Sequence, residues 1–485
     1  MSTMESSPSH QKPPDIAPTG VDWAYDKENP RNWPRLRKVA TGLIVCAIGF
    51  TTTLGASIYS PGHAEVEHEF HVSSTVALLP LSAYSLGLAF GPMISSPLSE
   101  AFGRRFVYLA TLPLCDIFIL ATGFSSGIVS LTVCRFFAGF FAAPGVSVAA
   151  AVISDFTAPE KRLVPLAGYY AMPWLGSAIG PLIGDFVVQA KGWRWTAWIV
   201  LIMAAAFHPP VLFLRESYKT TILQRRGKAR ISSEKSGDIL NSETESVSVM
   251  RTLQTFITST VIRPLHMLTT EPLVGFICLY TGFQFALLYT FIVASPWVFK
   301  TVYGFSMSAQ GLSFLGMVGG CMVAPFILIT LDYILRTRKS KLQSSTELFN
   351  PENKLRNALY GSFILPVALF WFGWSANSSV HWICPILAQA LAFVGSYLIY
   401  VPCSLYMVDV YGAKYSASSN GASSFSRYIL SAAFPLFVTQ MYEKLGVGWA
   451  SSLLGFLALS MAPIPWVFYH YGPAFRSRSS YEHGT

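Results

Sequence analysis

Twelve apolar runs constrain this chain more than any other feature, because roughly 20 residues at a rise of 1.5 Å each cross the hydrocarbon core of a bilayer. The chain is 52% hydrophobic and only 12% charged, whereas soluble domains are about 25% charged. We therefore predict an all-α membrane protein of twelve transmembrane helices. With ends accurate to a few residues, the runs are Lys38–Ser60, Thr75–Ile94, Phe106–Phe124, Ile128–Ile153, Val164–Val187, Trp195–Leu214, Leu273–Ser295, Gln310–Leu331, Asn357–Ala376, His381–Cys403, Ala422–Met441 and Trp449–Tyr469.

The distribution of positive charge orients these spans. Of the 34 lysine and arginine residues, the outer loops hold only Lys191, Arg194, Lys300 and Lys444. By the positive-inside rule, both termini then lie in the cytoplasm. The formal charge of +9 thus reflects topology, and we expect no nucleic-acid partner.

The spans fall into two sets of six, separated by a long polar stretch. We predict a cytoplasmic tail at 1–37, a six-span bundle at 38–214, a cytoplasmic linker at 215–271, a second six-span bundle at 272–470 and a cytoplasmic tail at 471–485. The middle of the linker, Ile231–Ser248, is rich in Ser and Glu without an apolar period, which is typical of a flexible linker open to phosphorylation. Two sets of six spans are the arrangement of two pseudo-equivalent bundles.

The most distinctive stretch is Leu166–Asp185 in the fifth span. Gly176, Gly180 and Gly184 recur every four residues, so they form a groove without side chains along one helix face. Pro181 lies beside the groove and removes one backbone donor, which favours a bend. The groove is compatible with tight helix packing or with a pivot.

Four charged or flexible residues join the second and third spans on the inner side: Glu100, Gly103, Arg104 and Arg105. Gly103 permits a tight turn. Two arginines beside a carboxylate can form a charge cluster that rearranges when the two bundles move. The alternative is that these charges only set the orientation of the spans in the membrane.

Two charges lie deep within the apolar runs, Arg135 in the fourth span and Asp116 in the third. A charge in this position is costly and normally faces a partner or a water-filled cavity. The two residues are about equidistant from the turn near Ser125, so an antiparallel hairpin places them at similar depth. Asp116 could therefore pair with Arg135 or face the cavity alone with a raised pKa.

A polar and aromatic face occurs in the seventh span, with Tyr280, Gln284 and Tyr289 at or near helical spacing. Such a face suits an amphipathic ligand, through stacking and a few hydrogen bonds; plain packing is the alternative. Arg427 is expected at the inner end of the eleventh span, where it can reach the interface.

Metal, cofactor and enzyme chemistry find little support in the sequence. The seven cysteines all fall inside predicted spans, and no pair has metal-ligand spacing. No ATP-binding P-loop is present, and the spans hold no cluster of His, Cys and carboxylate residues. We expect no cofactor, no metal and no enzymatic activity.

These motifs together resemble the drug:proton antiporters of the major facilitator superfamily, in particular the fungal polyamine and multidrug exporters. The fifth-span glycines resemble the family signature, which usually ends in a second glycine where this chain has Asp185. The inner loop from Glu100 to Arg105 resembles the family's loop signature, and Asn29-Pro30-Arg31-Asn32-Trp33 resembles its lead-in. The resemblance implies the major facilitator fold, alternating access, and a part for Arg135 in proton coupling; from its position in the hairpin, Asp116 could take up the proton.

We therefore predict a proton-coupled exporter of small amphipathic molecules such as secondary metabolites, toxins or drugs, working as a monomer in the plasma membrane, with the vacuolar membrane as an alternative. A polyamine:proton antiporter is the second hypothesis. Polycations require several carboxylates in the cavity, and only Asp116 and Asp185 lie near the spans. A third is a non-transporting sensor on the same scaffold, which would normally carry a long folded terminal domain.

Overall fold

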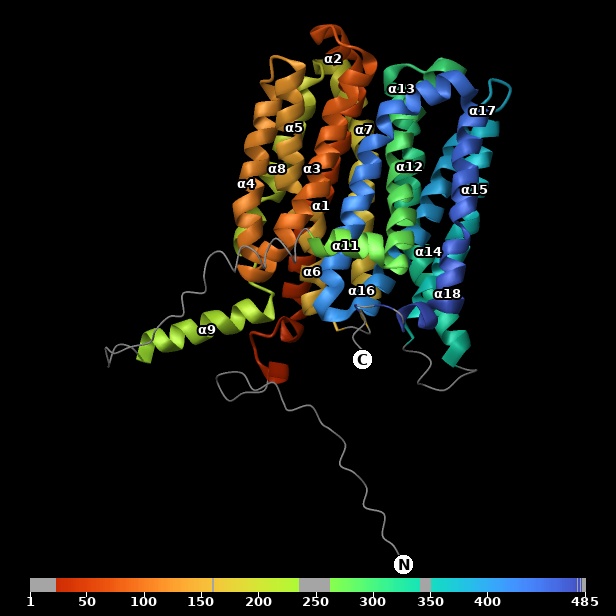
Figure 1. The fold of residues 1–485 in the computed structure, drawn as a ribbon. Helices are drawn as coiled ribbons and strands as arrows, with labels where there is room; N and C mark the ends of the chain where they lie inside the picture. The colour runs from red at the N-terminus through yellow and green to blue at the C-terminus, as the bar shows by residue number, and fades with distance from the viewer. Residues whose placement is uncertain are drawn as a thin grey trace, which may run out of the picture.

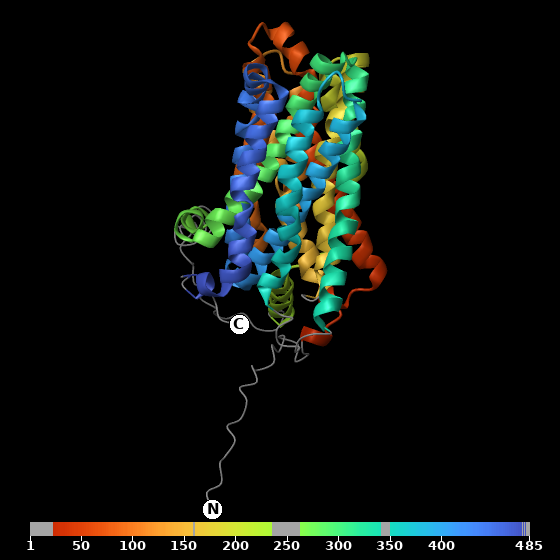
Figure 2. The ribbon, with the colours of Figure 1, turned by 90° about the vertical axis from the view of Figure 1, so that its right-hand side faces the viewer.

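The computed structural model describes residues 23–158, 161–234, 262–340 and 350–477, with 479 and 481, and this part of the chain contains helices and no strand. Two groups of helices stand side by side (Figure 1), and the views in Figures 1 and 2 show that their helices run along one common axis. The first group comprises α1 (Arg35–Ser57), α3 (Ser74–Ala101), α4 (Arg104–Gly123), α5 (Ile128–Ala142), α6 (Pro144–Phe156), α7 (Leu163–Lys191) and α8 (Arg194–Phe207). The second comprises α12 (Pro272–Tyr303), α13 (Met307–Ser313), α14 (Leu315–Ser340), α15 (Arg356–Ser375), α16 (Ile383–Ala433), α17 (Pro435–Met461) and α18 (Pro463–Arg476).

Eleven helical segments of the described chain are long and apolar enough to cross a membrane. The predicted eleventh span, 422–441, is not among them, yet the chain makes this crossing too. Backbone angles break the helix at Gly412 (φ 55°) and at Gly446 (φ 75°), and left-handed values of this kind suit glycine. Between these two breaks lie the second leg of α16 and the first leg of α17, which together form one crossing.

Short elements cap both ends of the bundles. α2 (His63–Phe70) covers the outer end of the first bundle (Figure 1), and α9 (Lys219–Glu234) and α11 (Arg263–Thr270) lie near the inner end. The lead-in before α1 contains two short 3-10 helices, η1 (Trp23–Tyr25) and η2 (Pro30–Asn32). Residues 235–261, which include most of the predicted flexible linker, lie outside the described residues.

Large apolar side chains cover the face that lipid would contact, as with Phe326 and Val129, which are more than 70% exposed. The interior is instead rich in tyrosine: the largest fully buried side chains are Trp174 and eleven tyrosines. A tyrosine carries an aromatic face and a hydroxyl, so the interior of these bundles offers both stacking surfaces and hydrogen-bonding groups.

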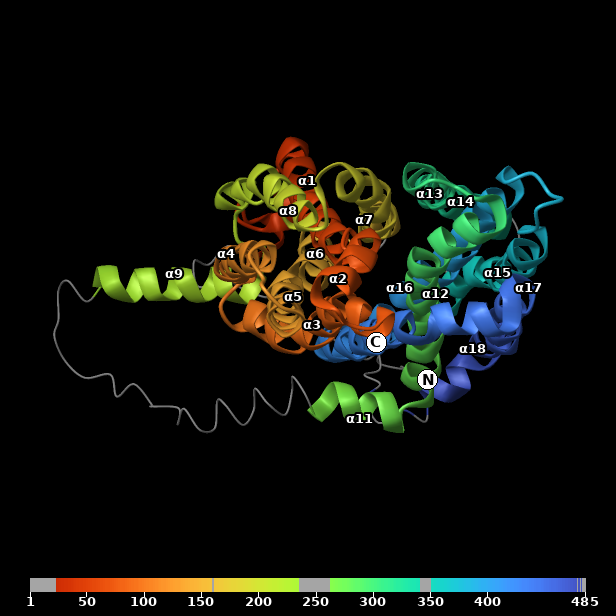
Figure 3. The same ribbon diagram turned by 90° about the horizontal axis from the view of Figure 1, so that it is seen from above.

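The two bundles meet along two seams, seen from above in Figure 3: α3 packs against α16 and α17, and α7 packs against α13 and α14. Toward the inner end, the Tyr397 hydroxyl donates to the Ala167 carbonyl. Toward the outer end, the Thr75 hydroxyl is hydrogen-bonded to the Gln440 side-chain amide at 2.7 Å. The bundles therefore touch on both sides of the membrane midplane.

Candidate functional site

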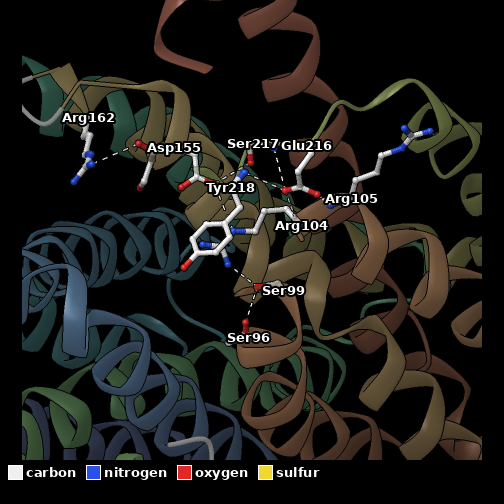
Figure 4. A network of polar contacts seen from close by, with 10 residues as sticks. Ser96, Ser99, Arg104, Arg105, Asp155, Arg162, Glu216, Ser217 and Tyr218 are labelled. Carbon is white, nitrogen blue, oxygen red and sulfur yellow. Dashed lines mark hydrogen bonds and ion pairs between the residues drawn. The ribbon is translucent and has the colours of Figure 1, made fainter. Parts of the chain in front are cut away.

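The inner loop between α3 and α4 is anchored by Arg104 and Glu216 (Figure 4). The Arg104 backbone N–H donates to Glu216 Oε1 at 2.9 Å. The Arg104 guanidinium donates to Ser99 Oγ at 2.5 Å and to Asp155 Oδ2 at 3.4 Å, and it lies 4.7 Å from the ring of Tyr218. This cluster joins the ends of α3, α4 and α6 to the segment between η5 (Pro209–Phe213) and α9.

Glu100 lies close enough to Arg104 to interact with it electrostatically, and its part in the rearranging cluster stays a prediction. It forms no ion pair in the described part of the chain, and the carboxylates that bind the loop are Asp155 and Glu216. Both are distant in sequence, so local spacing could not reveal them. The Arg105 backbone N–H donates to the Glu216 carboxylate at 3.3 Å, and the Arg105 guanidinium donates to a carbonyl of the segment after α8 at 2.9 Å.

Position 103 requires glycine because of its backbone conformation and because of the atoms around it. Its φ of 103° is unfavourable for a residue with a side chain. A Cβ at this position would lie 2.2 Å from Glu216 Oε2. The carboxylate can thus reach the start of α4 only because residue 103 is glycine.

The lead-in packs beneath this cluster, with Trp33 buried. Asp26 accepts two hydrogen bonds from the Arg226 guanidinium of α9, one of them at 2.9 Å. This guanidinium lowers the pKa of Asp26 from 3.8 to about 2. The lead-in and the cluster together line a cavity of about 540 Å³, so the lead-in is part of the inner face of the protein.

The glycine groove of α7 holds α1 of the same bundle. Cβ atoms at Gly176, Gly180 and Gly184 would lie 2.4, 2.0 and 2.7 Å from atoms of the segment between Phe50 and Ile58. Pro181 lies within the helix beside them and is buried. The groove therefore serves tight packing inside one bundle, and a pivoting part for these residues stays a prediction.

Arg135 is buried and saturated by backbone carbonyls. Its guanidinium donates to the carbonyls of Gly55 at 2.8 Å, Ala56 at 2.9 Å and Pro80 at 3.4 Å. It also lies 4.8 Å from the ring of Tyr84. One guanidinium thus ties α5 to α1 and α3.

The proposed Asp116–Arg135 pair is wrong. Asp116 Oδ2 lies 3.0 Å from His208 Nδ1, at the end of α8. The hairpin does place both residues inside the bundle, but Asp116 faces α8 while Arg135 faces α1 and α3. Asp116 is therefore not a lone cavity carboxylate either.

The three predicted ligand residues of α12 are all buried. Tyr280 and Gln284 are 0% exposed and Tyr289 is 1% exposed. In the described part of the chain, the two tyrosine hydroxyls and Gln284 Oε1 make no hydrogen bond of good geometry. A buried polar group without a hydrogen bond is costly. A ligand that forms hydrogen bonds with these atoms of α12 would remove that cost.

We expected Arg427 at the inner end of its span, and the structure shows that this prediction is wrong. It is only 8% exposed and lies between the helices. Its guanidinium donates to Tyr400 Oη at 2.7 Å and Ser424 Oγ at 2.8 Å. The rings of Tyr400, Phe285 and Tyr428 lie 5.0, 5.1 and 6.0 Å from it. We call these five residues the Arg427 cage.

Asp185 lies at the outer part of the α7–α13 seam. It is 2% exposed, and its buried Oδ2 has no hydrogen-bond partner in the part of the chain that the structure describes. A Cβ on Gly311 of α13 would lie 2.9 Å from Asp185 Cβ. A carboxylate is thus enclosed at a contact between the two bundles.

Comparison with known proteins supplies the wider context. A family model described as Major Facilitator Superfamily matches residues 45–435. "Polyamine transporter 4" of Saccharomyces cerevisiae is 33% identical, with 96% of this chain and 74% of that protein covered. "Ascochitine biosynthesis cluster MFS transporter" of Didymella fabae is 35% identical, with 96% and 90% covered. A solved proton:xylose symporter shares the fold, with a TM-score of 0.65 and 15% identity over 90% of this chain and 97% of that one.

Proposed function

Because the chain belongs to the major facilitator superfamily, and is thus a multi-pass membrane transporter with the predicted fold, we propose that it exports small amphipathic molecules in exchange for protons. The observation that carries this proposal is the tyrosine-rich interior, with unsatisfied polar atoms on α12. Such a surface suits molecules that combine an apolar body with a few polar groups. The similarity to a transporter of a fungal biosynthesis cluster supports export of a secondary metabolite.

Asp185 is the proton carrier in this proposal. Its contact with Gly311 buries it while the outer seam is closed, and separation of α7 from α13 would expose it to the outer solution. Burial without a partner favours the protonated form of a carboxyl, and exposure favours release of the proton. Arg135 cannot take this part because its guanidinium stays charged; it acts by holding the helices that Asp185 depends on.

A polyamine:proton antiporter is the alternative, supported by the similarity to "Polyamine transporter 4". A polycation would need several carboxylates at the centre of the bundles. Of the two carboxylates that the sequence placed near the spans, Asp116 is hydrogen-bonded to His208 and Asp185 lies at the outer seam. The proposal therefore favours a substrate that is not a polycation, exported across the plasma membrane by a monomer.

The experiment measures uptake into inside-out vesicles with an acidic interior, using 2-naphthoate, its neutral amide 2-naphthamide, and spermine. We expect Asp185→Asn to abolish the response to the pH gradient while exchange of substrate across the membrane at equal pH continues. Asp116→Asn is the matched control, since it also neutralises a carboxyl within a span. If Asp116→Asn uncouples transport and Asp185→Asn does not, the carrier is the Asp116–His208 pair. Wild-type uptake that does not respond to the pH gradient would refute proton coupling.

A further inference from the structure

We propose that the Arg427 cage binds an anionic group of the exported molecule, so that the substrates are amphipathic acids, such as carboxylates or ionised enols. This inference rests on the proposed function and adds the class of substrate. It turns on how the positive charges in the centre of the protein are compensated.

The charge of Arg427 has no counter-ion within the described residues. Among the described residues, its only hydrogen-bond acceptors are the neutral hydroxyls of Tyr400 and Ser424, and its buried Nε has no partner. Aromatic faces offset part of the cost of a buried cation, but a charge inside a membrane remains expensive until an anion joins it. The cage therefore has capacity for a negative group.

Arg135 provides an internal comparison. Its guanidinium is occupied by three backbone carbonyls, whose positions are fixed by the helices that carry them. The acceptors of Arg427 are hydroxyls, which rotate and can act as donors as well. A carboxylate could replace them at the guanidinium, or accept a hydrogen bond from them. Arg135 thus has a packing function, whereas Arg427 keeps donors available.

The cage also lies where the two bundles meet. On α7, in the other bundle, the ring of Tyr170 lies 5.3 Å from the ring of Tyr400, and the ring of Trp174 lies 5.2 Å from the ring of Phe285. These edge contacts close the cage from the first bundle. Movement of α7 would remove them and admit a ligand, whose apolar body could stack on the same rings.

A second polar group adjoins the cage. Tyr289 is one helical turn beyond Phe285 on α12, so the two residues share a helix face. Within the described residues its hydroxyl is buried and makes no hydrogen bond of good geometry. It interacts with Arg135 and with Tyr428 of the cage, so it lies at the border between the cage and the first bundle.

The test compares two probes of nearly equal size, 2-naphthoate and its neutral amide, 2-naphthamide, on the purified full-length protein. We expect the wild type to bind naphthoate about tenfold more tightly, because a hydrogen bond to a charged group contributes more than one between neutral groups. Arg427→Gln should weaken naphthoate binding by about tenfold or more and change naphthamide binding less than about twofold. Arg427→Lys should keep part of the preference, since it retains the charge without the planar fork.

Arg356→Gln is the matched control. Arg356 also lies over a tyrosine ring, 5.9 Å from the ring of Tyr469, and it donates to the Tyr469 hydroxyl at 3.2 Å. It is the first residue of α15 and lies outside the cage. We expect it to leave both affinities unchanged.

Equal binding of the two probes by the wild type would overturn the inference, even if Arg427→Gln fails to fold. Equal loss of both probes in Arg427→Gln would also overturn it and make Arg427 a packing residue. Proton-driven uptake of both probes without preference would refute only the acid specificity. Arg427-dependent binding of naphthoate without any proton-driven transport would instead refute the proposed function.

Discussion

Substitution of Gly180 by alanine tests how tightly α1 lies in the groove of α7. The new Cβ would lie 2.0 Å from Ser57 Oγ and 2.9 Å from the backbone nitrogen of Ile58. The serine hydroxyl can rotate away, but the backbone nitrogen cannot, so the two helices must move apart. Overpacking of this kind costs about 1–3 kcal/mol, and we expect the upper half of that range because backbone must shift.

The expected loss is measurable as a melting temperature in detergent. For a bundle of roughly 200 residues, about 2 kcal/mol corresponds to a fall of roughly 4–8 °C. A thiol-reactive dye can follow unfolding, because four of the seven cysteines are buried in the native structure: Cys115, Cys278, Cys321 and Cys403.

Gly168→Ala is the matched control on the same helix. A Cβ at Gly168 would have no neighbour within 4 Å, so we expect no loss of stability. A melting temperature of Gly180→Ala equal to that of Gly168→Ala would refute the close packing of α1 and α7. A double variant with Ser57→Gly should recover only part of the loss, since the contact with Ile58 remains.

Three further substitutions address the inner face and the buried arginine. Gly103→Ala should reduce stability by more than about 1 kcal/mol, because its φ is positive and its Cβ would meet Glu216; the same melting assay measures this. The Asp26–Arg226 contact contributes stability above the ordinary pKa of 3.8, and this contribution disappears as the pH falls toward the folded value of about 2. The protection factors of the lead-in amides, which are corrected for the intrinsic pH dependence of amide exchange, should therefore fall at low pH, and Asp26→Asn should lower them already at pH 7. Arg135→Lys should lower the melting temperature and transport together, because one ammonium cannot reach the same three carbonyls.

Apolar length was sufficient to predict the number of spans but not the depth of every residue. The eleventh apolar run begins near Ala422, whereas the helical leg begins after Gly412 with polar residues. Arg427 is therefore about 15 residues, or roughly 22 Å, along that leg. Hydropathy placed it at an end because it does not count polar residues such as Ser418 and Ser419 as part of a span, although both are buried.

Distance from a hairpin turn predicts depth in the membrane, but it does not predict the direction in which a side chain points. Asp116 and Arg135 were correctly placed within the spans, yet their side chains face different helices. Which face of a helix meets which neighbour depends on the packing of helices distant in sequence. The same reason hid Asp155 and Glu216, because the contacts that join them to Arg104 span 51 and 112 residues.

An anionic substrate would change the energetics of exchange with protons. When a monoanion leaves and a proton enters, two charges move in the direction favoured by a membrane that is negative inside. A potential of 100 mV then contributes about 4.6 kcal/mol, against about 2.3 kcal/mol for a neutral substrate. Proteoliposomes held at set potassium diffusion potentials can measure this difference, and naphthoate transport should depend on the potential about twice as steeply as naphthamide transport. Equal dependence for the two probes would mean that naphthoate crosses in its protonated form, and Arg427 would then select the anion at binding without carrying its charge across the membrane.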